Sequence, residues 1–237
     1  MVTGDGDILN GDGGRPARDD VTIRIDGELP LTAGLVAEVA AMCDRAEDAN
    51  HDGAVVVHVS GAPGRLWVRD LTVALVSRWE RVLRRLEHLP TTTIAVADGD
   101  CGGAALDALL ATDYRVATAS TRLVVAVDSE ATWPGMALYR LVHQGANAAA
   151  IRRAVLFGVP IAAREALALH LIDEVNDDLA GALAAAADMA RSFSGAELAI
   201  RRQLMFEAAT VSFEDALGVH LAACDRALRR ASAGAVS

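Results

Sequence analysis

The stretch Ile94-Ala-Val-Ala-Asp-Gly-Asp-Cys-Gly-Gly-Ala-Ala-Leu-Asp-Ala-Leu-Leu-Ala-Thr-Asp-Tyr-Arg-Val-Ala117 decides the fold of this 237-residue chain. An apolar strand ends in two consecutive glycines, and a helix opens directly after them. Glycines let a backbone approach a ligand closely, and a helix N-terminus presents unpaired N–H groups and the positive end of a dipole. Such a turn suits a developing negative charge. The same glycines also fit a tight strand-to-helix turn that binds nothing.

Strands and helices alternate on both sides of this stretch. Alternating polarity predicts a strand over 21–25, and a β-branched run predicts a buried strand over 53–59. Apolar residues at helical spacing predict helices over 32–48 and 70–88. The remaining expected elements are a strand over 91–97, a helix over 104–111, and short strands over 114–117 and 122–126. This order implies right-handed crossovers and a parallel sheet of the α/β class.

Three regions follow from this pattern. Residues 1–20 are rich in Gly and Asp and are expected to form a flexible tail. Residues 21–175 are expected to form the α/β core, and residues 176–237 a C-terminal helical region that serves oligomerisation. Within that last region a stripe runs down one side of a helix over 213–231, formed by Leu217, Leu221, Cys224 and Leu228. The stripe suits a packing face within the chain or a contact between copies equally well.

Composition excludes several classes of protein. The net charge of −10 argues against a nucleic-acid partner, whose phosphates require basic patches. No run approaches the ~18 apolar residues of a membrane span, and the N-terminus lacks the order of a signal peptide. Cys43, Cys101 and Cys224 have no metal-ligand spacing, which suits a reducing compartment and predicts the cytoplasm. Without a His and an acid at recognisable spacing, a thiol nucleophile at Cys101 is disfavoured.

The stretch 94–117 resembles the crotonase (enoyl-CoA hydratase/isomerase) pattern, in which a strand, a Gly-rich turn, an acid and a short helix lead to an Asp and another strand. Downstream, Trp133-Pro-Gly-Met-Ala-Leu-Tyr-Arg-Leu141 matches the family's Pro-Gly turn and the helix ending in Arg-Leu, and 157–175 matches a later helix and strand. The likeness runs in order over roughly 21–230. It implies a crotonase-like spiral of ββα units with a C-terminal helical region, assembled as a homotrimer or hexamer.

The resemblance implies two backbone oxyanion donors. The donor at the helix start falls on Ala104, and the other lies in the loop 64–70, best matched by Trp67. Each such donor contributes about 3 kcal/mol to a developing oxyanion. The family usually has small residues and a Gly where this chain has a Trp-Val pair, so the CoA channel is expected to be reshaped. The predicted CoA-binding residues are Gly103, Arg65, Val68 and Arg69; Arg65 and Arg69 flank the first oxyanion loop, where they suit CoA phosphates and a solvated position equally well.

The family's hydratases add two glutamates that activate water. The first falls on Asp107, a shorter acid one helical turn from Ala104. The second falls on Val127, which cannot act as an acid or base. Asp128 or Glu130 are the alternatives, and we take Glu130 as the preferred substitute. The competing interpretations are a capping or solvated role for Asp107 and a solvated loop position for Glu130.

The short length and the 133–138 turn resemble the small enoyl-CoA hydratase-like proteins of 3,5-dihydroxyphenylglycine biosynthesis. Those proteins act beside a type III polyketide synthase that makes 3,5-dihydroxyphenylacetyl-CoA. The resemblance implies a polyketide- or acyl-CoA substrate, dehydration or cyclisation, and no cofactor beyond the CoA of the substrate. One alternative is an ordinary enoyl-CoA hydratase or isomerase of acyl-CoA catabolism, which the missing second acid disfavours. The other is a non-catalytic protein that binds an acyl-CoA or a partner enzyme.

Overall fold

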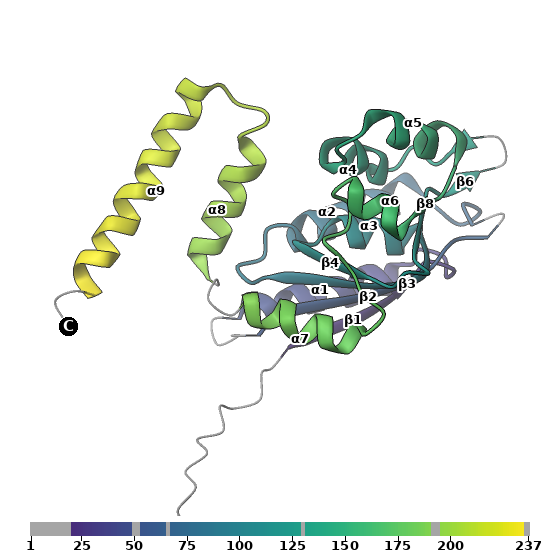
Figure 1. The fold of residues 1–237 in the computed structure, drawn as a ribbon, viewed down its shortest axis with the longest axis horizontal. Helices are drawn as coiled ribbons and strands as arrows, with labels where there is room; N and C mark the ends of the chain where they lie inside the picture. Colours follow the sequence, from purple (N-terminus) through teal and green to yellow (C-terminus); the bar gives the residue numbers. More distant parts are fainter. Residues whose placement is uncertain (1–19, 49–52, 65–66, 129–130, 191–194, 235–237) are drawn as a thin grey trace, which may run out of the picture.

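The computed structural model describes residues 20–48, 53–64, 67–128, 131–190 and 195–234, and Figure 1 shows their arrangement. Nearly all of the expected N-terminal tail falls outside the described residues. Two of the predicted site residues, Arg65 and Glu130, fall outside them as well.

A parallel sheet forms the centre of the molecule, in the order β1-β2-β3-β4-β9. Its strands are β1 (Val21–Asp26), β2 (Val55–Gly61), β3 (Thr93–Gly102), β4 (Tyr114–Ala117) and β9 (Glu174–Val175). The expected parallel α/β sheet is confirmed. The expected strand over 91–97 continues to Gly102, because β3 pairs with β4 up to Ala97 and then with a second strand.

Beyond Ala97 a smaller set of strands branches from β3. These strands are β5 (Arg122–Val124), which pairs parallel with β3, and β8 (Ile161–Ala162), which pairs antiparallel with β5. A separate two-stranded antiparallel sheet consists of β6 (Val127–Asp128) and β7 (Ala131–Thr132). Gly99, with φ at 65°, lies between the two pairing stretches of β3. The strand can change partners there because glycine adopts a positive φ at little cost.

Helices cover both faces of the sheet (Figure 1). The helices are α1 (Ala33–Glu47), α2 (Val73–Leu86), α3 (Ala104–Leu110), α4 (Met136–Gln144), α5 (Ala148–Phe157), α6 (Ala163–Ala168), α7 (Leu179–Ala190), α8 (Ala196–Glu207) and α9 (Phe213–Gly234). The larger core lies between the sheet and α1, α2 and α3. A smaller Ala-rich core lies under α7 on the other face. Helix α3 carries Ala104 and Asp107, the residues matched to the family's chemistry.

The ends of β1, β2 and β3 meet at Gly27. Its N–H donates to the carbonyl of Ser60 at 2.7 Å. A Cβ at this position would lie 2.3 Å from the carbonyl oxygens of both Gly61 and Gly102. This close approach of three backbones fixes the glycine turn that precedes α3.

Helix α2 begins at a threonine cap. The Thr72 hydroxyl accepts a hydrogen bond from the Leu75 N–H at 3.1 Å. We expect Thr72→Ala to lower the free energy of unfolding by about 1 kcal/mol, since one N–H of the first turn loses its acceptor, and to lower the Tm by roughly 2–4 °C for a chain of this size. Thermal denaturation followed by circular dichroism measures both. Thr72→Ser keeps the hydroxyl and serves as the control, so equal losses in the two variants would exclude a capping role.

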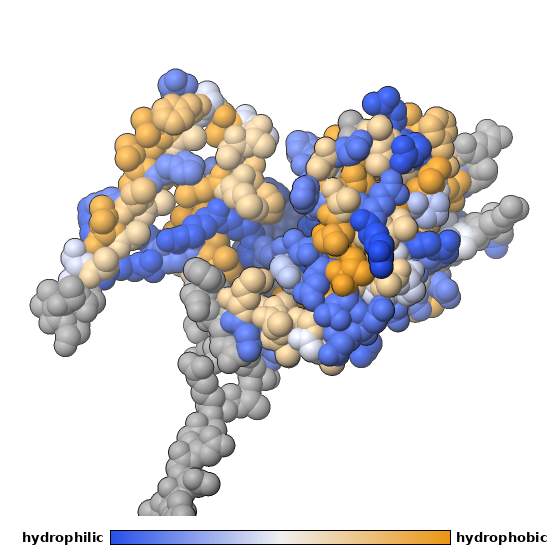
Figure 2. Space-filling view, in the orientation of Figure 1, coloured by the Kyte–Doolittle hydropathy of each residue, from blue (hydrophilic) through white to orange (hydrophobic). Residues whose placement is uncertain are grey.

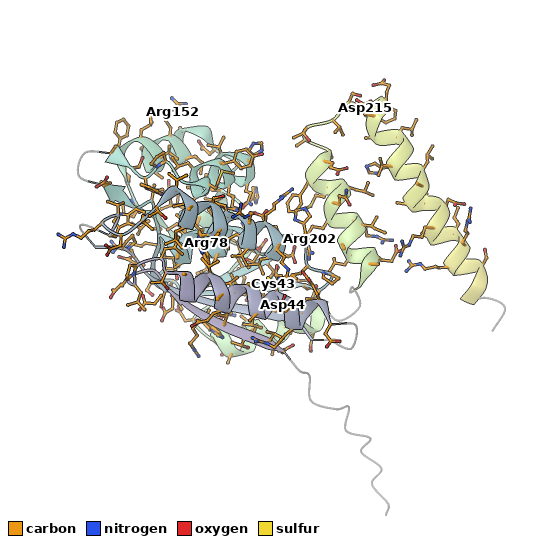
Figure 3. The ribbon with its side chains drawn as sticks, turned by 180° about the vertical axis from the view of Figure 1, so that it is seen from behind. Cys43, Asp44, Arg78, Arg152, Arg202 and Asp215 are labelled. Carbon is orange, nitrogen blue, oxygen red and sulfur yellow. The ribbon has the colours of Figure 1, made fainter. Side chains whose placement is uncertain are left out.

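Helices α8 and α9 form an arm that stands away from the core (Figure 1). Arg202 ties α8 to the core where the two meet (Figure 3): its guanidinium donates to the Asp113 carboxylate at 2.6 and 2.8 Å and to the carbonyls of Leu89 and Thr91. In α9 the stripe of Leu217, Leu221, Cys224 and Leu228 is largely exposed, and hydrophobic surface is visible over the arm in Figure 2. The stripe therefore does not serve as a packing face among the described residues of this chain.

Candidate active site

A small, partly open cavity lies between α2, α3 and the segment before α4. Its volume is about 40 Å³, which is enough for about three water molecules. The residues that matter for its chemistry are Trp67, Trp79, Glu80, Ala104, Asp107 and Trp133. All three tryptophans of the chain line this cavity.

Asp107 reaches the cavity from the first turn of α3. Its Oδ2 accepts a hydrogen bond from the indole N–H of Trp79 at 3.0 Å. Burial, reinforced by the negative charge of Glu80, raises the pKa of Asp107 to about 7, against the lowering effects of the Trp79 hydrogen bond and the Arg140 charge. Both protonation states of Asp107 are therefore populated near neutral pH, which is the condition that favours general acid–base chemistry.

The start of α3 places the predicted oxyanion donor beside this acid. Gly103 precedes the helix with φ at 53°, and no side chain caps it. The first-turn N–H groups have no carbonyl one turn earlier to accept them. Ala104 is buried at the cavity wall. The expected neighbours Gly103, Ala104 and Asp107 thus lie around one cavity.

The predicted first donor, Trp67, borders the same cavity. Its ring packs edge-on against Trp133, with centroids 5.2 Å apart and planes at 75°. Its indole N–H donates to the Val127 carbonyl at 3.3 Å. The two rings fill space beside the start of α3.

Two of the predicted CoA contacts lie off this cavity. Val68 is half-buried, and its carbonyl accepts the Leu71 N–H at 3.0 Å. The Arg69 side chain is exposed. Val127, the position matched to the second acid, is 48% exposed and lies outside the cavity wall. The second-acid position of the family pattern thus supplies no group to this cavity.

Sequence reasoning missed Glu80 and Arg140. Glu80 lines the cavity, and its Oε2 lies 3.0 Å from Nη1 of Arg140. Arg140 is 5% exposed and also contacts Glu87 through Nε at 2.7 Å. Burial raises the pKa of Glu80, although the Arg140 charge opposes this. The sequence does contain a sign of Glu80's position: it lies four residues after the apolar Val76, and this spacing places the two side chains on the same face of α2.

Other features of the described residues carry no competing chemistry. Burial raises the pKa of the Cys101 thiol to about 12, so that thiol is inert as a nucleophile. Within the described ranges no group of three or more His, Cys, Asp or Glu residues could hold a metal ion. None of the described helices is long and apolar enough to cross a membrane. A larger groove of about 760 Å³ lies along the ends of β1 and β2 and contains none of the matched residues.

No family model matches the chain. A curated protein from Amycolatopsis orientalis named enoyl-CoA-hydratase is 57% identical over 211 residues, which covers 89% of this chain and 97% of that protein.

Solved structures share the fold at low identity. An enoyl-CoA hydratase/isomerase family protein from Silicibacter pomeroyi superposes with a TM-score of 0.74 at 19% identity, covering 89% of this chain and 95% of that one. An enoyl-CoA hydratase from Mycobacterium smegmatis gives 0.74 at 18% identity, with 89% of each chain covered. These structures confirm the expected crotonase-like fold. Together with the Amycolatopsis relative, they show that the chain belongs to the enoyl-CoA hydratase family of the crotonase superfamily.

Proposed function

We propose that this protein acts on a polyketide- or acyl-CoA thioester and promotes dehydration or cyclisation toward 3,5-dihydroxyphenylacetyl-CoA beside a type III polyketide synthase. The observation that carries the proposal is the shared cavity of Asp107 and the uncapped start of α3 at Ala104. The Amycolatopsis relative, named as an enoyl-CoA-hydratase, supports the hydratase or lyase class of reaction. The substrate brings its own CoA, and the proposed reaction needs no further cofactor.

In the proposed dehydration, Asp107 acts first as the general base and then as the general acid. The N–H groups of Ala104 and Trp67 donate to the thioester oxygen as it gains negative charge. The Asp107 carboxylate takes a proton from the α-carbon, which leaves an enolate. The enolate then expels the hydroxyl from the β-carbon, and Asp107 returns its proton to that hydroxyl, so water departs and Asp107 is ionised again. A pKa near 7 suits both transfers.

The size of the cavity favours a second candidate, a non-catalytic auxiliary of the synthase. At about 40 Å³, with Trp67 and Trp133 at its border, the cavity has no room for an acyl chain unless these side chains move. In this second function the protein binds a thioester or the synthase itself, and Asp107 is a structural acid.

The proposal extends to assembly and location. The exposed stripe on α9 suits contacts between copies, and we propose a homotrimer or hexamer. Analytical ultracentrifugation of the full chain measures this directly. The three free cysteines suit the reducing cytoplasm, where we propose that the protein works.

Mass spectrometry of a thioester panel tests the reaction. The wild-type protein is incubated with 3-hydroxyacyl-CoA, enoyl-CoA and polyketide-CoA thioesters, each with and without the synthase. We expect loss of one water from a hydroxylated polyketide thioester. Water exchange only on simple acyl chains would establish an ordinary hydratase instead. An unchanged panel, with synthase stimulation that persists in Asp107→Asn, would establish the auxiliary.

A further inference from the structure

The cavity wall holds one acid that the family pattern does not provide. Among the described residues that line the cavity, Asp107 and Glu80 are the only ones with an ionisable side chain. They come from different helices, α3 and α2, and Glu80 is paired with Arg140, which is not part of the cavity wall. No described residue donates a hydrogen bond to Oδ1 of Asp107 or to Oε1 of Glu80. Each acid therefore has one carboxylate oxygen that no described residue engages.

We propose that Glu80, held by its ion pair with Arg140, is the second carboxylate of this site and disfavours a negative charge on Asp107. Glu80 is thus a positioning residue that acts through Asp107. A carboxylate beside a second acid disfavours a second negative charge. The arrangement replaces the acid that is missing at Val127 with one from another part of the fold.

The charges around Asp107 support this assignment. From α2 comes Glu80, from α4 comes Arg140, and Glu87, just beyond the end of α2, contacts the far side of that arginine. The rest of the described cavity wall, formed by residues such as Leu31 and Val125, is uncharged. Arg140 also contacts Glu87, and its lowering effect on the pKa of Asp107 is smaller than the raising effect of Glu80. Glu80 is therefore the negative charge that Asp107 meets across the cavity.

The consequence for the reaction rests on the proposed function. An acid that both accepts and returns a proton works best when its two protonation states are close in free energy. Without the Glu80 charge, burial would still raise the pKa of Asp107, but by less in total, so the protonated form would be less populated and the proton would return to the leaving hydroxyl more slowly. The electrostatic part of the inference holds without any reaction and can be measured alone.

The Trp79 indole N–H reports the state of Asp107 because the two are hydrogen-bonded. We would follow its ¹⁵N–¹H NMR signal against pH in the full-length protein, assigned by its loss in Trp79→Phe. In the wild type we expect a midpoint of about 7. In Glu80→Gln we expect the midpoint to fall by about one pH unit or more, since a neighbouring like charge is removed. Glu80→Leu provides a second neutral variant if Glu80→Gln does not fold.

Glu87→Gln is the matched control, because it removes the other partner of Arg140 but lies off the cavity wall. Its midpoint should stay at the wild-type value, and Glu80→Asp should restore most of the shift. An equal midpoint in wild type and Glu80→Gln would overturn the proposal and leave Glu80 as a structural partner of Arg140. If the midpoint moves but no thioester turns over, the electrostatic pair stands and the proposed function fails. If turnover occurs with the same pH profile in wild type and Glu80→Gln, the catalytic part fails alone.

Discussion

Asp107→Asn is expected to reduce thioester turnover by about 10²–10⁴-fold, the range that general acid–base catalysis contributes. Asn has nearly the same volume, and its amide oxygen can still accept the Trp79 hydrogen bond that orients Asp107 at 3.0 Å. Only proton transfer is lost, so thioester binding should change little. Single-turnover kinetics measures the chemical step, and isothermal titration calorimetry measures binding.

Asp44→Asn is a suitable control for that substitution. Asp44 lies on α1 in an exposed ion pair with Arg85 at 2.7 Å, away from the cavity wall (Figure 3). Its turnover should match that of the wild type. Full turnover in Asp107→Asn would show that another group moves the proton and would remove the support for a catalytic Asp107.

Gly27→Ala should lower the free energy of unfolding by about 3 kcal/mol or more, at the upper end of the range for overpacking. The new Cβ would lie 2.3 Å from the carbonyl oxygens of Gly61 and Gly102, and both are backbone atoms of strands held in the sheet. Three strand ends would have to separate. Urea denaturation gives the loss of stability, and the turnover assay should show a further loss because the turn before α3 would shift.

Gly34→Ala is the comparison for this change. Gly34 lies in the first turn of α1, and the methyl group that the substitution adds would meet only the Thr32 hydroxyl, at 3.5 Å, which is an ordinary contact. The substitution should stabilise the protein by about 0.5–1 kcal/mol, because the unfolded chain loses freedom. If the two alanine variants proved equally stable, the close approach at Gly27 would carry no energetic weight.

The sheet was predictable from the sequence because its signals are local. Strand β2 is a continuous β-branched run, and α2 is a clear amphipathic stripe with caps close to the expected positions. The far end of β3 was not predictable, since residues 98–102 join a strand only because β5 pairs with them. No local pattern encodes a partner that the chain reaches about twenty residues later.

The candidate site likewise has one part that the sequence predicts and another that it does not. Asp107 and Ala104 lie within one continuous stretch, so spacing along α3 places them together. Glu80 belongs to a different helix, and beside the buried Trp79 it has the pattern of a solvated acid at the edge of a stripe. Its role depends on α2 and α3 lining the same cavity and on Arg140 of α4 contacting Glu80. Long-range packing, rather than sequence spacing, makes this pair.

All three tryptophans lie at one cavity, so the intrinsic tryptophan fluorescence of the protein reports on this region. Light at the red edge of indole absorption excites only these three side chains, so the emission wavelength reports the polarity of their surroundings at the cavity. A thioester that displaces its waters should shift the emission without background from other regions. The arm of α8 and α9 contains no tryptophan and contributes no emission at this excitation wavelength. In a thermal denaturation, the helical circular dichroism signal is compared with the tryptophan emission. Loss of the dichroism signal at a lower temperature than the change in emission would therefore mean that the arm unfolds while the cavity stays intact.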